Sequence, residues 1–277
     1  MALVAFITSS VTAGCTSPTG KYDGAAAGVN FAGEVIQGGR FHHKIYRNGH
    51  DAGGGVLHVF IEGDASVKQA LRSSPPDPTP RHPLMLHLMQ KDESGAILLG
   101  RPCYHGLFTI DGCEIRHLGP ERYSPEIVKS MIAALQSELD HSGATRVILV
   151  GYSGGGTLAF LMAAQFPGVA ALVTLAGNLD SAALVTHHHS PALSGSLDPA
   201  DLPALPRSIR QLHFFGSKDE NVPASLAQKT LTRQGAAPII MQGFDHECCW
   251  RDIWPDIRMR LETGLRPPAI MSESQPQ

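Results

Sequence analysis

Several features are scarce in this sequence of 277 residues. Charged residues make up 17% and aromatic residues 6%, whereas apolar residues make up 43%, which excludes a disordered chain or a coiled coil. No run approaches the ~20 apolar residues of a membrane-spanning helix. The 22 basic residues do not outnumber the 25 acidic residues, so charge gives no support for nucleic-acid binding. A soluble α/β or α+β chain of one large or two small domains remains.

The N-terminal residues resemble a bacterial lipoprotein signal. An apolar stretch, Ala2–Ile7, is followed by small residues and then by Cys15, and in such signals the cysteine is lipidated and becomes N-terminal. The resemblance implies a signal segment over residues 1–15 and a protein of the cell envelope, lipid-anchored or periplasmic. The alternative is a frayed N-terminus or a buried first strand, in a cytoplasmic protein.

The cysteine count is odd, and lipidation of Cys15 leaves four cysteines, Cys103, Cys113, Cys248 and Cys249. An even remainder suits an oxidising compartment. Cys103 and Cys113 flank a short loop and are the first candidate disulfide. The adjacent pair Cys248–Cys249 is expected either to close a ring or to stay reduced, and all four could instead be reduced core residues. No C-x-x-C pair occurs, so a structural zinc site has little support.

The order of the expected elements predicts an α/β fold with a mostly parallel, doubly wound sheet flanked by helices. The chain offers a helix that begins with the cap Ser124 and Pro125 and closes at Gly143. Apolar runs typical of buried strands alternate with helical segments; these runs are Val56–Ile61, Arg146–Val150, Ala170–Leu175, Ile209–Phe215 and Pro238–Met241. Outside one domain at 41–265, we expect a tether or loose hairpin over residues 16–40 and a disordered tail over 266–277.

The strongest chemical signal is a strand that runs directly into Gly151-Tyr152-Ser153-Gly154-Gly155. In the pattern G-x-S-x-G the serine sits on a strained strand-to-helix turn, where neighbouring side chains would clash and glycines are needed. The turn places the hydroxyl at the N-terminus of a helix, which favours developing negative charge. This context nominates Ser153 as a nucleophile.

With this motif, residues 55–260 resemble the α/β-hydrolase superfamily, whose members order their catalytic residues as serine, acid and histidine. Asp219 lies in a G-x-x-D-x-x-V-P loop after a strand, and His246 follows the next strand. The resemblance implies that His246 takes the proton of Ser153 and that Asp219 orients the imidazole. Glu220 and Asp180 are alternative acids. Asp245 is expected to be a solvated turn residue.

The resemblance also implies an oxyanion hole made of two backbone N–H donors. One would come from Gly154 and the other from the loop after Val56–Ile61, at Asp64 or Gly63. Carboxylates beside this hole oppose the developing charge unless they face away or are paired. Arg81 and Arg101 are the partners we consider.

These features predict a serine hydrolase that cleaves an ester or thioester through an acyl-enzyme. A peptidase or amidase on the same scaffold is the first alternative, and a non-catalytic envelope lipoprotein that binds through this fold is the second. No metal or organic cofactor is implied, and the expected partner is a small acyl substrate, with no nucleic acid and with membrane contact only through the N-terminal lipid. Residues 178–206 are expected to form a short cap, with His187–His189 in a loop on the active-site side.

Overall fold

A computed structural model describes residues 17–110 and 112–265. The expected lipoprotein signal with Cys15 and the expected tail at 266–277 therefore lie outside the described residues. Among the described helices, none combines the length and apolar character needed to cross a membrane.

The core of the molecule is an eight-stranded sheet with the strand order β1-β2-β4-β3-β5-β6-β7-β8. The strands β3 to β8 pair in parallel, whereas β2 runs antiparallel to both β1 and β4. This arrangement confirms the predicted fold class. The strand bounds are β1 (Ala32–Gly38), β2 (Phe41–Arg47), β3 (Val56–Ile61), β4 (Ala96–Leu99), β5 (Arg146–Tyr152), β6 (Val169–Leu175), β7 (Arg210–Gly216) and β8 (Pro238–Met241).

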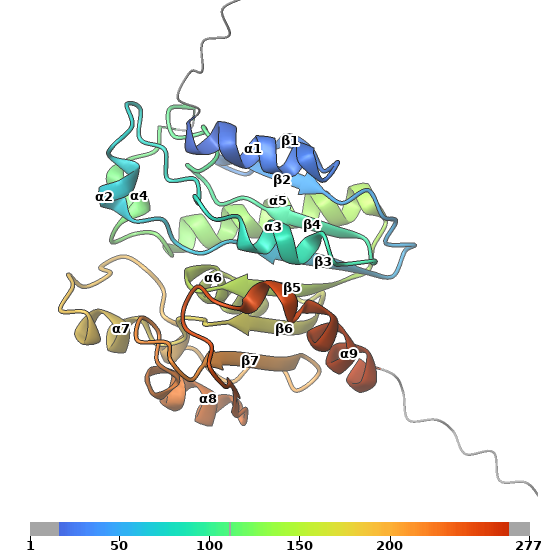
Figure 1. Cartoon of the computed structure of the whole chain (residues 1–277), viewed down its shortest axis with the longest axis vertical. Helices are drawn as coiled ribbons and strands as arrows, with labels where there is room; N and C mark the ends of the chain where they lie inside the picture. Colours follow the sequence, from blue (N-terminus) through green and yellow to red (C-terminus); the bar gives the residue numbers. More distant parts are fainter. Residues whose placement is uncertain (1–16, 111, 266–277) are drawn as a thin grey trace, which may run out of the picture.

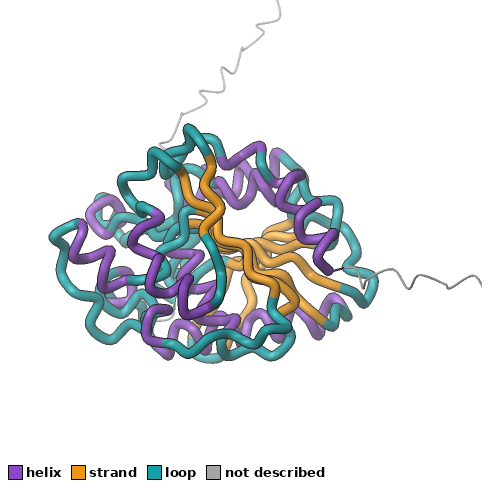
Figure 2. Tube along the Cα trace, turned by 90° about the horizontal axis from the view of Figure 1, so that it is seen from below, coloured by secondary structure: helices purple, strands orange, loops and turns teal. Residues whose placement is uncertain are grey.

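Helices lie on both faces of this sheet, and the strands twist along its length (Figures 1 and 2). The α-helices are α1 (Pro18–Gly28), α2 (Val67–Ala70), α3 (Leu84–Met89), α4 (Ile115–Leu118), α5 (Pro125–Ser142), α6 (Gly154–Ala163), α7 (Ser181–His187), α8 (Gln228–Gln234) and α9 (Trp254–Leu265). Short 3-10 turns are η1 (Pro199–Asp201), η2 (Ala224–Ala227) and η3 (Trp250–Asp252).

Two apolar clusters explain why both faces are covered. Along β5, Val147 and Leu149 belong to the cluster that holds α5, α6 and α8, and Ile148 and Val150 belong to the cluster that holds α1, α3 and α9. Successive side chains of a strand point to opposite faces. A continuous apolar strand therefore supplies both clusters, which is typical of a parallel sheet buried on two sides.

Residues 17–40, the described part of the expected tether or loose hairpin at 16–40, are regularly structured. They form α1 and β1, and the side chains of Tyr22 and Ala26 are buried. β1 pairs with β2 along its whole length although most of its side chains are exposed. Backbone pairing rather than apolar burial orders this strand, so hydrophobic periodicity could not reveal it.

Helix α5 begins and ends where its capping residues predict. The side chain of Ser124 accepts a hydrogen bond from Ile127 N, and Pro125 is the first helical residue. At the other end Gly143 is the C-cap with φ 69°, a left-handed conformation that glycine adopts without strain. This helix packs on the sheet edge formed by β1 and β2.

Candidate active site

Ser153 lies on the turn between β5 and α6, the two elements that the G-x-S-x-G motif predicts. Its backbone has φ 51° and ψ −121°, a strained conformation for a residue with a side chain. The turn is tight because a Cβ on Gly151 would lie 2.3 Å from the carbonyl oxygen of Gly155, and a Cβ on Gly155 would lie 2.3 Å from that of Ile61. The glycines therefore allow this turn to pack against the end of β3.

The structure brings the side chains of Ser153, His246 and Asp219 together at the carboxyl end of the sheet, from three separate loops. His246 Nε2 lies 3.1 Å from Ser153 Oγ, so the hydroxyl can donate to the imidazole. His246 Nδ1 lies 2.9 Å from Asp219 Oδ2, so the other ring nitrogen can donate to the carboxylate. These distances are within the reach that proton transfer from a serine requires.

The carboxylate of Asp219 is fully buried and firmly held. Its Oδ1 accepts hydrogen bonds from the backbone N–H groups of Asn221 and Val222, which leaves Oδ2 to face His246. The two alternative acids have other positions: Asp180 caps α7 by accepting from Ala183 N, and Glu220 is exposed. Of the three candidate acids, Asp219 is the one bonded to His246.

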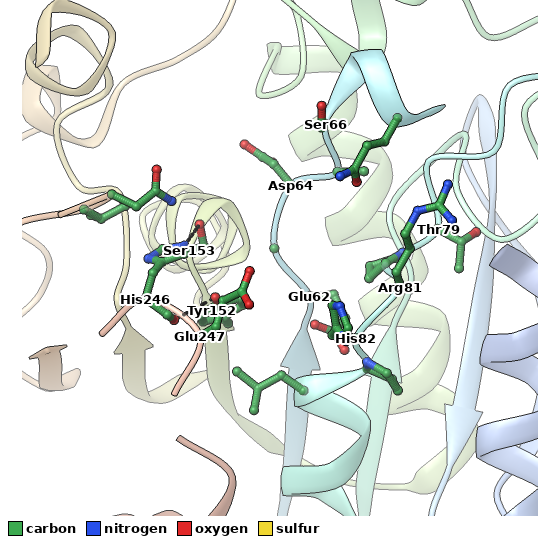
Figure 3. Close-up of a pocket in the computed structure, with 18 of the residues that line it drawn as sticks. Glu62, Asp64, Ser66, Thr79, Arg81, His82, Tyr152, Ser153, His246 and Glu247 are labelled. Atoms are coloured by element: carbon green, nitrogen blue, oxygen red, sulfur yellow. Dashed lines mark hydrogen bonds between the residues drawn. The ribbon is translucent and has the colours of Figure 1, made fainter. Parts of the chain in front are cut away.

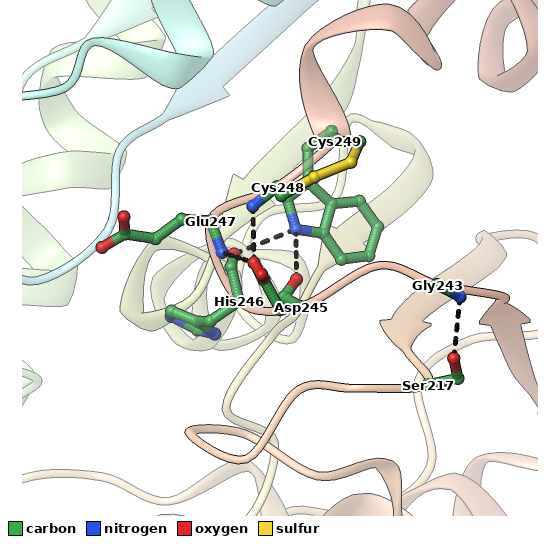
Figure 4. Close-up of a disulfide and its surroundings, with 8 residues drawn as sticks. Ser217, Gly243, Asp245, His246, Glu247, Cys248 and Cys249 are labelled. Atoms are coloured by element: carbon green, nitrogen blue, oxygen red, sulfur yellow. Dashed lines mark hydrogen bonds between the residues drawn. A yellow bond between two sulfur atoms is a disulfide. The ribbon is translucent and has the colours of Figure 1, made fainter.

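The loop that carries His246 is fixed by hydrogen bonds to its backbone (Figure 4). Tyr152 Oη and Trp250 Nε1 both donate to the carbonyl oxygen of His246, at 2.8 and 2.9 Å. The Asp245 carboxylate accepts hydrogen bonds from the backbone N–H groups of Glu247 and Cys248. Asp245 is thus an exposed turn residue, as expected. These contacts set the direction of the imidazole toward Ser153.

Both cysteine pairs considered from the sequence are disulfides in the structure. Cys103 and Cys113 are joined across their short loop. Cys248 and Cys249 form a bond between adjacent residues, directly after the turn that presents His246 (Figure 4).

Two backbone amides are available for an oxyanion beside Ser153. Gly154 is the first residue of α6, so its N–H has no acceptor within the helix. In the loop after β3, the N–H of Ala65 donates to the hydroxyl of Tyr104. This leaves the N–H groups of Asp64 and Gly63 as the candidates for the second donor.

The side chain of Asp64 lies against Gly154, since a Cβ on Gly154 would be 2.3 Å from its carboxylate. Arg101 donates a hydrogen bond to it and Arg122 Nη1 lies 3.2 Å away, so two guanidinium groups compensate its charge; Tyr123 donates a further hydrogen bond. Burial alone would raise the pKa of this carboxyl, but the two guanidinium charges outweigh it and hold the pKa below its ordinary value. Of the two partners considered from sequence, Arg101 pairs with Asp64 and Arg81 does not.

Glu62 is the other carboxyl of this loop, and it is buried. It accepts hydrogen bonds from Tyr22 Oη and from the backbone N–H of Met85. Burial raises its pKa to about 7, against the effect of these donors. Near neutral pH, Glu62 therefore carries less than a full negative charge. The negative charge of both carboxyl groups beside the proposed oxyanion site is thus reduced or compensated.

The segment at 178–206 contains α7 and η1 and borders the site. Leu184 and His188 line the cavity beside Ser153. His187 and His188 each donate through Nε2 to a backbone carbonyl, that of Glu220 and that of Asn221 respectively. The histidine run thus ties the end of α7 to the loop that carries Asp219.

Sequence reasoning missed three residues that support the site. Arg122 and Tyr123 contact Asp64, yet they lie far from it in sequence and belong to no motif. Tyr152 could have been noticed, because it is the variable residue directly before Ser153 in the motif. Its hydroxyl holds the His246 loop, a contact between segments that only the fold brings together.

Comparisons with known proteins support the fold. A family model described as the alpha/beta hydrolase fold matches residues 112–224. No curated protein matches the chain.

Solved structures resemble the whole fold. A membrane phospholipase A described as a bacterial virulence factor is 13% identical, with a TM-score of 0.55, over 90% of this chain and 91% of that chain. A hormone-sensitive lipase from a metagenome library is 18% identical, with a TM-score of 0.55, over 88% and 92%. A Pyrococcus furiosus esterase is 10% identical, with a TM-score of 0.57, over 86% and 92%.

The sheet topology, the strand–serine turn–helix unit and the family-model match show that the chain has the α/β-hydrolase fold. At these low identities the structural likeness shows the fold alone, so chemistry must be argued from the site.

Proposed function

We propose that this chain is a serine hydrolase that cleaves a carboxylic ester or thioester through an acyl-enzyme intermediate. The observation that carries the proposal is the continuous hydrogen-bonded series from Ser153 Oγ through His246 to Asp219. The solved structures described above include an esterase and lipases, which favours an ester over a peptide substrate.

In the proposed reaction, His246 Nε2 takes the hydroxyl proton as Ser153 Oγ attacks the carbonyl carbon. Asp219 stabilises the imidazolium that forms and keeps Nδ1 protonated. The N–H groups of Gly154 and of Asp64 or Gly63 would donate to the oxyanion. His246 then protonates the leaving alcohol or thiol, and a water activated by the same imidazole hydrolyses the acyl-enzyme.

The compensated charge of Asp64 helps to decide between a hydrolase and a non-catalytic binding module with the same fold. An unpaired carboxylate against Gly154 would oppose an oxyanion and would favour a binding module. Because Arg101 and Arg122 compensate this charge, the acidic loop is compatible with acyl transfer.

The test is turnover of a matched panel, a p-nitrophenyl ester, a thioester and a peptide p-nitroanilide, by the wild type and by Ser153→Ala. We expect the ester and thioester to be hydrolysed, and Ser153→Ala to lower kcat by at least about 10⁴-fold. Faster cleavage of the anilide would favour the amidase alternative. Turnover that survives in Ser153→Ala would exclude this serine as the nucleophile, and absence of all turnover would favour the binding module.

A further inference from the structure

A cavity of about 740 Å³ opens beside Ser153 and His246, and both polar and apolar side chains line it (Figure 3). The larger aliphatic side chains that line it are few and come from separate elements: Leu84 of α3, Leu184 of α7 and Val222 of the acid loop. The charged side chains of the lining therefore bear on which substrate the cavity accepts.

The acidic side chains on the inner wall of the cavity already have partners. Asp64 pairs with Arg101 and Arg122. Asp77 accepts hydrogen bonds from Thr19 N, from Thr19 Oγ1 and from Thr79 N. Glu62 accepts from Tyr22 and Met85. These bonds reduce the negative potential that the three carboxyl groups direct into the cavity.

Two arginines of the same cavity have no such partners. Arg81 and Arg251 line it, are exposed, and have no ion pair or hydrogen bond with any described residue. Figure 3 shows Arg81 and His82 across the cavity from Ser153 and His246.

Arg251 lines the cavity close to α3. It lies in η3, which packs against α3. His82 lies shortly before the first residue of α3. His87 of α3 also lines the cavity, and its pKa is lowered by burial and by the nearby charge of Arg251. Among the described lining residues, the exposed acid is Glu247, next to His246 on the other side. The cavity is therefore polarised, with unpaired positive charge opposite the nucleophile.

We propose that the wall formed by Arg81, His82, His87 and Arg251 binds an anionic group of the ester substrate, a carboxylate or a phosphate. The planar guanidinium presents several N–H donors in a fork that matches the oxygens of either group. The inference rests on the proposed hydrolysis at Ser153. It adds the substrate class: an ester whose acyl part or alcohol part carries a negative charge.

The test compares neutral esters with related esters that carry an added anionic group. One pair is p-nitrophenyl butyrate and mono-p-nitrophenyl succinate, with the charge on the acyl part. The other is the butyrate ester of glycerol and that of glycerol phosphate, with the charge on the alcohol part. We expect the charged member of one pair to have the higher kcat/KM, and the pair that shows the preference identifies the carboxylate or the phosphate as the group bound.

The variants are Arg81→Gln, Arg251→Gln and the double variant. We expect the double variant to raise KM for the preferred anionic ester about tenfold, as two partly exposed ion pairs are lost, with little change in kcat. The neutral ester should be unaffected, because it makes no ion pair with this wall. Arg207→Gln, at an exposed arginine outside the cavity, is the matched control and should alter neither substrate.

Two results overturn the inference, and they can be told apart. Equal or better turnover of both neutral esters, with no change in the arginine variants, removes the anionic subsite and leaves the serine hydrolase intact. Absence of turnover for every ester, in a folded wild-type protein, removes the proposed function and the subsite with it.

Discussion

At the residue scale, the loop after β3 shows how two carboxyl groups can lie beside a site for negative charge. Asp64 remains ionised but is compensated by two arginines. Glu62 has no ion pair among the described residues and is buried, so its pKa rises to about 7. One group is neutralised by partners and the other by its own proton. In both cases, less negative charge lies beside the N–H groups that would bind the proposed oxyanion.

The shift at Glu62 predicts a stability difference that depends on pH. Because burial raises its pKa from 4.5 to about 7, the folded protein binds this proton between those pH values while the unfolded chain releases it. The contribution of Glu62 to stability is therefore present below about pH 4.5 and is lost as the pH rises toward 7.

Glu62→Gln cannot release a proton, so the free energy of unfolding of the wild type should fall relative to this variant by roughly 3 kcal/mol across the window. Urea unfolding at several pH values measures the difference. Glu220→Gln, at an exposed acid, is the control. Parallel pH profiles for wild type and Glu62→Gln would contradict the assignment.

At the element scale, the unit β5–turn–α6 fixes the position of Ser153. Gly155 packs directly on the end of β3, where a Cβ would lie 2.3 Å from Ile61 O and 2.5 Å from Glu62 O. Backbone carbonyls cannot rotate away as a flexible side chain could. The turn and the proposed oxyanion loop must therefore separate if this position gains a side chain.

We expect Gly155→Ala to lower the free energy of unfolding by about 3 kcal/mol and to impair ester turnover, because overpacking displaces both segments. Gly24→Ala in α1 is a matched control, since its Cβ meets nothing within 4 Å; alanine there should be neutral or stabilising by up to about 1 kcal/mol. Urea unfolding and turnover measure both variants. A Gly155→Ala protein as stable and active as the wild type would contradict the close packing.

At the scale of the whole molecule, the sequence predicts what depends on local pattern. Apolar runs predict the buried strands, and the Ser124 cap and Gly143 predict the bounds of α5. The motif around Ser153, together with the family resemblance, also names the side chains that the structure brings together. These features are local because burial and backbone geometry act on short segments.

Features that depend on contacts between distant segments cannot be predicted from local sequence patterns. β1 is ordered by pairing with β2 while most of its side chains are exposed, so no apolar alternation marks it. The choice of Arg101 and Arg122, rather than Arg81, as partners of Asp64 depends on how the loops fold. The same loops leave Arg81 and Arg251 facing the cavity, which no sequence pattern indicates.

The central claim is that Ser153 is an activated nucleophile, and covalent labelling tests it most directly. The wild type, Ser153→Ala and Asp219→Asn are each treated with a fluorophosphonate, and the adduct is located by peptide mass spectrometry. The account predicts one adduct on Ser153, none on Ser153→Ala, and slow labelling of Asp219→Asn because its imidazole is poorly oriented. An unmodified Ser153 in the folded wild type, or an adduct that persists in Ser153→Ala, would contradict it.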